Sequence, residues 1–176
     1  MGGHLELLKW AHANGCPRDE KELYVGAQNG HEVMVRALIE AGSDVNRAED
    51  TGATPLIIAA QNGHEAVVRA LIEAIADISK AEDDGSTSLS IAACRGQEAV
   101  VRVLIEAGAD IDEAIDIGVT PLFMASQKGN EALVRILIEA GADVNQAADN
   151  GWTPLFMAAG MGHAAIVQLL RKASTV

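Results

Sequence analysis

Aromatic residues are scarce in this chain, because only five of its 176 residues are Phe, Tyr or Trp. A buried core must therefore be aliphatic, and the 49% hydrophobic content is enough to build one. Cysteine is equally rare: Cys16 and Cys94 are too few for a disulfide framework. Their scarcity favours a reducing compartment, with the cytoplasm as the first expectation and the nucleus as the alternative.

Basic residues and long apolar runs are also in short supply. The chain has 13 Lys and Arg against 25 Asp and Glu, a formal net charge of −12, which argues against binding to nucleic-acid phosphates. The longest apolar runs, such as residues 55–60, have six residues, whereas about 20 are needed to cross a bilayer. Charges interrupt the first 13 residues, so they do not resemble a secretory signal. We therefore expect a soluble protein that binds neither nucleic acid nor membrane.

What the sequence does contain is a repeat with a period of 33 residues. Gly52, Gly85, Gly118 and Gly151 each open a variant of one phrase, namely GATPLIIAA, GSTSLSIAA, GVTPLFMAS and GWTPLFMAA. A set of leucines later in each unit recurs with the same period. A fixed period of this length indicates an array of stacked units rather than one globular core. The leucines are Leu38, Leu71, Leu104, Leu137 and Leu170.

The local chemistry of one unit predicts two helices and a hairpin. Thr54 can cap a helix, and Pro55 fits the first helical position. Asn62-Gly63 ends that helix, and an apolar stripe predicts a second helix over residues 65–74. The polar segment 77–85 suits an extended hairpin tip. Each helix pair exposes an apolar face that only its neighbour can cover.

A 33-residue unit that reads TPL, then AA, then GH, then LIEAGADVN resembles the ankyrin repeat. The resemblance covers residues 18–176 and implies an all-α solenoid of stacked helix–turn–helix pairs with β-hairpin loops, forming one continuous domain. Residues 4–17 align with a second helix alone and resemble a shorter variant of the unit. The predicted units are 1–17 (a half repeat), 18–50, 51–83, 84–116, 117–149 and a capping repeat at 150–176.

The two ends of the array differ. Arg171 stands where the internal units carry isoleucine, which suits a helix face without a following neighbour. The N-terminal half repeat lacks a first helix, so we expect that the chain is part of a longer array. The alternative is that something else covers that side.

One helix ending departs from the pattern. Gly42, Gly108 and Gly141 follow the second helices, at a position where a left-handed residue commonly closes a helix, whereas the second full unit has Ile75 there. A β-branched residue costs about 1–2 kcal/mol in that conformation. Ile75 therefore either bears this cost or forces another ending, and we predict a local irregularity at residues 74–79.

No catalytic or metal-binding constellation emerges. His31, His64 and His163 share one repeat position, where the resemblance implies hydrogen bonds to loop backbone; Gln97 and Asn130 at that position could not act as bases. His4 and His12 have no partners at metal-ligand spacing. The many carboxylates recur in identical environments, which cannot separate their pKa values as acid–base catalysis requires. We expect no enzymatic activity and no cofactor.

Variable positions on the predicted loop tips and first helices are the candidate binding surface, because the resemblance implies that partners lie along this concave face. Four of the five aromatic residues fall there, and aromatic side chains are frequent interface hot spots. Trp152 is the preferred anchor, while Phe123 and Phe156 have the alternative of packing between units. The predicted partner-binding residues are Trp152, Phe156, Phe123, Val119, Ile117, Met161, Tyr24, Gln61, Arg95, Asp84, Asp116 and Lys128.

Acidic residues recur on the hairpins and would attract a basic protein partner. The alternative is that they only keep the array soluble. Three further alternatives stay open: an inert or engineered scaffold, self-association through an uncovered end, and a substrate of an asparaginyl hydroxylase. The last rests on Asn46 and Asn145, whose Asp-Val-Asn context is similar to hydroxylated ankyrin segments; the competing interpretation is an asparagine that ties down its own loop.

Overall fold

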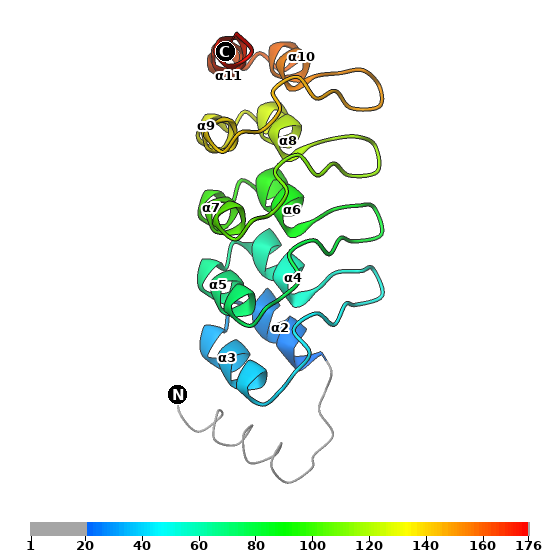
Figure 1. Ribbon diagram of the computed structural model, residues 1–176, viewed down its shortest axis with the longest axis vertical. Helices are drawn as coiled ribbons and strands as arrows, with labels where there is room; N and C mark the ends of the chain where they lie inside the picture. The colour runs from blue at the N-terminus through cyan, green and yellow to red at the C-terminus, as the bar shows by residue number, and fades with distance from the viewer. Residues whose placement is uncertain (1–20, 176) are drawn as a thin grey trace.

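The computed structural model describes residues 21–175, in which ten helices form five pairs stacked in a single row (Figure 1). This arrangement confirms the predicted all-α solenoid, whereas the exact unit borders stay a prediction. The first helices are α2 (Glu22–Gln28), α4 (Pro55–Asn62), α6 (Ser88–Arg95), α8 (Pro121–Lys128) and α10 (Pro154–Gly160). The second helices are α3 (Glu32–Glu40), α5 (Glu65–Glu73), α7 (Glu98–Glu106), α9 (Glu131–Glu139) and α11 (Ala164–Ala173).

Four of the first helices begin with a threonine cap, and in three of them a proline follows it. The backbone N–H of Ile57 donates to the Thr54 hydroxyl at 3.3 Å, which satisfies one of the free donors at the start of α4, and Pro55 occupies the next position. Gly63 ends α4 in the left-handed conformation, with φ of 76°. The predicted start and end of this helix are confirmed. The other capping threonines are Thr87, Thr120 and Thr153.

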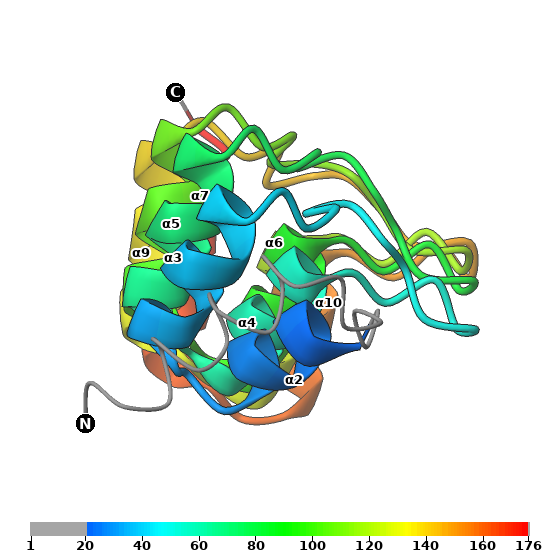
Figure 2. The same cartoon turned by 90° about the horizontal axis from the view of Figure 1, so that it is seen from below.

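The core lies between the two rows of helices. Seen along the stack, the second helices form one row, the first helices form another, and the loops extend to one side (Figure 2). Leu71, Leu104 and Leu137 are fully buried in one continuous cluster that runs through the described pairs. Each pair covers the apolar face of the next, as expected for a solenoid.

The loops differ from the predicted β-hairpins, since residues 21–175 contain no named strand and only one isolated bridge, between Ala81 and Thr87. Each tip is a tight turn that is linked to the next tip by a backbone hydrogen bond. The N–H of Asp83 donates to the Thr51 carbonyl at 3.1 Å. These bonds hold the tips in register along the stack. The equivalent bonds join Asp116 to Asp84 at 3.0 Å and Asp149 to Ile117 at 3.2 Å.

The predicted irregularity at residues 74–79 is wrong. Ile75 adopts the left-handed conformation, with φ of 62°, and its side chain is 85% exposed. The N–H of Ala76 donates to the Leu71 carbonyl at 3.0 Å, as the N–H of Ala109 does to Leu104 in the next unit. The helix ending is therefore conserved within the array, and Ile75 bears the conformational cost.

Replacing Ile75 by glycine should stabilise the protein. Ile75→Gly removes the left-handed strain and loses almost no buried surface, so we expect the free energy of unfolding to increase by about 1 kcal/mol. The reciprocal control is Gly108→Ile, because nothing lies within 4 Å of a Cβ placed at Gly108. It should destabilise by a similar amount. Urea denaturation measures both, and a destabilised Ile75→Gly variant would show that the isoleucine makes a stabilising contact.

Some predictions concern residues outside 21–175. The half repeat at 1–17, its histidines His4 and His12, and Cys16 all lie outside the described residues. Cys94, by contrast, is an exposed free thiol on α6.

Candidate partner-binding surface

Exposed apolar side chains gather in the last two described helix pairs. Trp152 is 44% exposed and Phe156 is 56% exposed, and their ring centroids lie 5.2 Å apart in a tilted arrangement. Ile117 and Met161 are also exposed large apolar residues. The pair Trp152 and Phe156 is called the aromatic patch below.

Local hydrogen bonds fix the backbone at both residues of the aromatic pair. The N–H of Trp152 donates to Asn150 Oδ1 at 2.9 Å, and the Trp152 carbonyl accepts from the N–H of Ala148 at 2.9 Å. Phe156 lies in the first turn of α10, where its N–H donates to the Thr153 hydroxyl at 3.2 Å. The two rings are thus attached to a closed turn and a capped helix, so little ordering is needed when they contact a partner.

Phe123 does not belong to the binding surface, contrary to the prediction. Its side chain is only 4% exposed and packs in a small cluster with Ala148 and Met157, against which Val119 lies partly buried. Met157 belongs to the next unit along the array, and Ala148 lies in the loop that leads to it. Phe123 therefore packs between units, which was the alternative for this residue, whereas Phe156 is free to contact a partner.

The other predicted residues spread along the array. Tyr24 is partly buried against the core, and burial, followed by the nearby charges of Glu49 and Glu82, raises the pKa of its hydroxyl. Gln61 is partly buried, and its carbonyl accepts a hydrogen bond from Gln97 Nε2 at 3.3 Å. The remaining four, Arg95, Lys128, Asp84 and Asp116, are exposed.

The linked loop tips carry the negative charge in one line. Asp50, Asp83, Asp84, Asp116 and Asp149 are exposed there, and we call them the acidic ridge. Beside it, burial and then the charges of Asp84 and Asp83 raise the pKa of Glu82. Hydrogen bonds from Ser86 lower the pKa of Asp84 instead, so this carboxylate keeps its charge.

The repeated histidine position joins neighbouring units. His64 Nε2 lies 3.0 Å from the Gln28 carbonyl, and His163 Nε2 lies 3.1 Å from the Gln127 carbonyl. These carbonyls lie at the ends of first helices, where backbone acceptors lack partners within the helix. The predicted structural role is confirmed for His64 and His163, while His31 is exposed.

A second polar link between units was not predicted. Asn46 Oδ1 accepts a hydrogen bond from the N–H of Asp77 on the next loop at 2.7 Å. The equivalent Asp112 accepts from the N–H of Asp143 at 3.0 Å. Asn46 therefore ties down the following loop rather than its own. The sequence feature that could have indicated this link is a short polar residue that recurs every 33 positions, at Asn46, Ser79, Asp112 and Asn145.

Comparison with protein families gives a match described as ankyrin repeats in three copies, over residues 1–82, 23–115 and 113–175. The chain belongs to the ankyrin repeat family. Ankyrin repeats are generally protein–protein interaction modules and are typically not enzymes. A search of curated proteins finds no match.

The described part of this ankyrin array runs from residue 21 to residue 175. No helix in that range combines the length and the apolar character that a membrane span requires. No group of three or more His, Cys, Asp or Glu side chains in the same range could hold a metal ion.

Hydroxylation of the ankyrin loops stays a prediction. Asn46 is partly buried with its side-chain oxygen engaged, whereas Asn145 is exposed and accepts only a long bond, of 3.4 Å, from the Ser174 hydroxyl. A modifying enzyme would therefore reach Asn145 more readily than Asn46.

Asp112 makes the stability of the array depend on pH. Burial is the main cause that raises its pKa; the hydrogen bond from the Asp143 N–H opposes this shift, and the charges of Asp143 and Asp110 add to it. The folded state therefore holds this proton more tightly than the unfolded state, so the contribution of Asp112 to stability decreases as pH rises above about 4. Asp112→Asn keeps an acceptor for the Asp143 N–H and removes the charge.

We expect the free energy of unfolding of Asp112→Asn, measured by urea denaturation, to exceed that of the parent by about 0.5 kcal/mol at pH 7. At pH 3 this difference should disappear. The control is Asp116→Asn, which removes one exposed charge from the same loop. A difference between Asp112→Asn and the parent that does not change with pH would contradict the assignment.

Proposed function

We propose that this ankyrin array binds a protein partner through the face made by the loop tips and first helices, with Trp152 as the anchor. The observation that carries the proposal is the exposed Trp152–Phe156 pair, in a chain whose aliphatic core needs few aromatic residues. Tryptophan is among the residues most enriched in interface hot spots.

The acidic ridge supports a basic partner. It lies on the same loop tips as Ile117 and Trp152, so a partner with an apolar anchor and flanking Lys or Arg would meet both features at once. Complementary charge mainly accelerates encounter and is screened by salt. We therefore propose an intracellular partner segment that combines an apolar side chain with basic neighbours.

The test begins with selection of peptides on the parent protein from a random display library. We expect the selected peptides to carry an aromatic or aliphatic residue beside Lys or Arg. Trp152→Ala should weaken their binding at least tenfold by calorimetry. The matched control is Val33→Ala, which removes another exposed apolar side chain, on α3, and should change affinity less than twofold.

The same pair of variants tests binding in a cell lysate. Proteins captured by the parent and by Val33→Ala, but lost with Trp152→Ala, are partners of this face. Peptides that bind Trp152→Ala as tightly as the parent would overturn the anchor. If the only protein captured is a second copy of the chain, sedimentation of the parent and Trp152→Ala will show self-association instead.

A further inference from the structure

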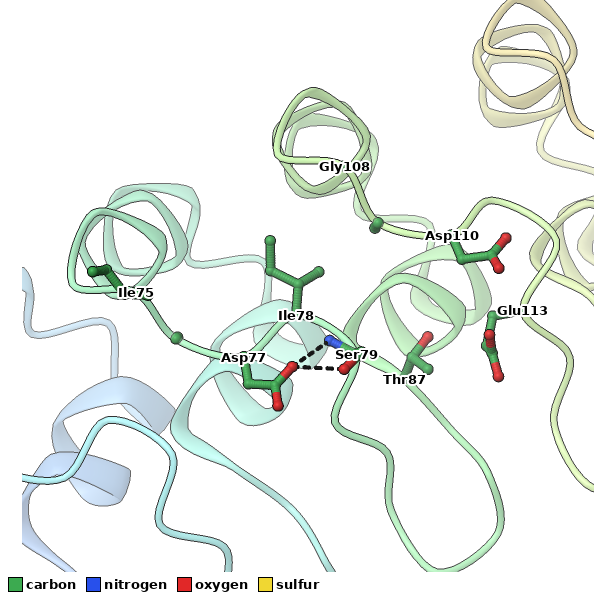
Figure 3. A pocket seen from close by; sticks show the side chains of 10 residues that line it. Ile75, Asp77, Ile78, Ser79, Thr87, Gly108, Asp110 and Glu113 are labelled. Atoms are coloured by element: carbon green, nitrogen blue, oxygen red, sulfur yellow. Dashed lines mark hydrogen bonds between the residues drawn. The ribbon is translucent and has the colours of Figure 1, made fainter.

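A groove of about 610 Å³ opens between two neighbouring loops, away from the aromatic patch. One wall is formed by residues 75–79 after α5, and the other by residues 108–113 after α7. In Figure 3, Ile78 projects into the space between the loops, while Asp110 and Glu113 lie on the opposite loop. The volume is large enough for one long side chain with its backbone.

The groove lies where the link between loops is missing. At the preceding junction Asn46 accepts from the N–H of Asp77, and at the following one Asp112 accepts from the N–H of Asp143. The equivalent residue here is Ser79, whose shorter side chain donates to Asp77 Oδ1 on its own loop at 2.6 Å. The Asp110 N–H, which the pattern would pair with residue 79, is therefore left available to a ligand.

The lining combines aliphatic surface with negative charge. Ile75 and Ile78 supply the apolar part, and Asp77, Asp110 and Glu113 supply three carboxylates. None of the described residues that line the groove is basic, although Lys80 is close enough to help lower the pKa of Asp77. Lysine and arginine match this lining, because both carry a cation at the end of an aliphatic stem.

Ile75 provides a separate indication of function. It is a strained, 85% exposed isoleucine at the groove wall, in a position that is glycine in three other units. Strain that the fold does not need is often retained at binding sites. A ligand that packs against Ile75 gives this side chain a role that folding does not.

We propose that this groove docks an extended segment of a protein partner, with a Lys or Arg side chain whose stem lies along Ile75 and Ile78 and whose cation faces the carboxylates. The Asp110 N–H donates a hydrogen bond to a backbone carbonyl of the segment. This site is distinct from the aromatic patch and does not depend on the proposed function of that patch.

The probe is the capped pentapeptide Gly-Leu-Lys-Leu-Gly with its arginine counterpart, added at millimolar concentration to ¹⁵N-labelled protein. We expect amide shifts confined to residues 75–80 and 108–114, with Asp110 among the largest. The same peptide with Glu in place of Lys should give none. No shift with either basic peptide, or shifts spread along the acidic ridge, would overturn the proposal.

Ser79→Asn is the decisive variant, because it supplies the missing link without changing the charge. Asn at this position should accept from the Asp110 N–H, raise the unfolding temperature and reduce peptide affinity at least fivefold. Asp110→Asn should weaken binding similarly. The charge control is Asp83→Asn on the acidic ridge, which should change affinity less than twofold.

Two outcomes separate this site from the proposed partner face. Trp152→Ala should leave peptide binding to the groove unchanged. A loss of binding at both sites, in a variant that unfolds at the same urea concentration as the parent, would overturn the groove as a separate site. Equal weakening by Asp83→Asn and Asp110→Asn would show a general attraction to an acidic protein and would overturn the groove.

Discussion

Leu104→Ala should lower the free energy of unfolding by about 3 kcal/mol. Leu104 lies in α7, is fully buried, and belongs to the continuous cluster between the helix rows. Truncation removes the transfer free energy of the side chain and leaves a cavity that its neighbours cannot fill completely. Because α7 contacts both α5 and α9, the loss also weakens two junctions of the array.

Arg102→Ala is the control in the same helix. Arg102 is exposed, so its replacement should change stability by less than about 0.5 kcal/mol. Urea denaturation followed by circular dichroism measures both variants. A cost below about 1 kcal/mol for Leu104→Ala would mean that the leucine column does not form the core.

Gly118→Ala should cost about 3 kcal/mol. Gly118 has φ of 73°, and a Cβ there would lie 2.6 Å from Asp149 Oδ1 and 2.9 Å from the Asp149 backbone nitrogen. The alanine bears the left-handed strain and also pushes away the next loop, which breaks the bond from the Asp149 N–H to the Ile117 carbonyl. Trp152 lies three residues beyond Asp149, so peptide affinity at the aromatic patch should decrease as well.

Gly151→Ala separates the strain from the clash. Gly151 has φ of 79°, but nothing lies within 4 Å of a Cβ placed there. It should therefore cost about 1 kcal/mol, the strain alone. Equal urea midpoints for Gly118→Ala and Gly151→Ala would show that the contact between loop tips contributes nothing.

The sequence was sufficient for the fold because the determinants of each helix are local and recur. Thr54 and Pro55 set the start of α4, Gly63 sets its end, and Leu71 marks the buried side of α5. Each determinant acts within a few residues, so its effect is visible without knowledge of distant contacts. The repeat period then supplied the packing arrangement.

Local determinants did not predict the conformation of Ile75 or the burial of Phe123 and Phe156. The penalty for a left-handed isoleucine can be read from the sequence, but whether the array keeps this helix ending depends on the packing of the loop. Phe123 and Phe156 occupy the same repeat position, but Met157 of the following pair covers Phe123. Within the described residues no further pair follows to cover Phe156. Burial at this position thus depends on the neighbouring unit.

The polar links between loops were missed for a related reason. Asn46 looked like a residue that binds its own loop, yet its oxygen reaches Asp77, 31 residues later. Only the stacked arrangement brings these two groups together. The groove at Ser79 could not be predicted for the same reason, since its lining residues come from two loops that are brought together only by stacking.

The stacking of pairs has a consequence for how the protein is made. The principal helix contacts join each helix to its own partner and to the pairs directly before and after it. Finished pairs therefore need nothing from residues still to be synthesised, apart from a cover for their last face. The chain can acquire its final shape progressively during translation, with each newly emerged pair docking onto those already formed.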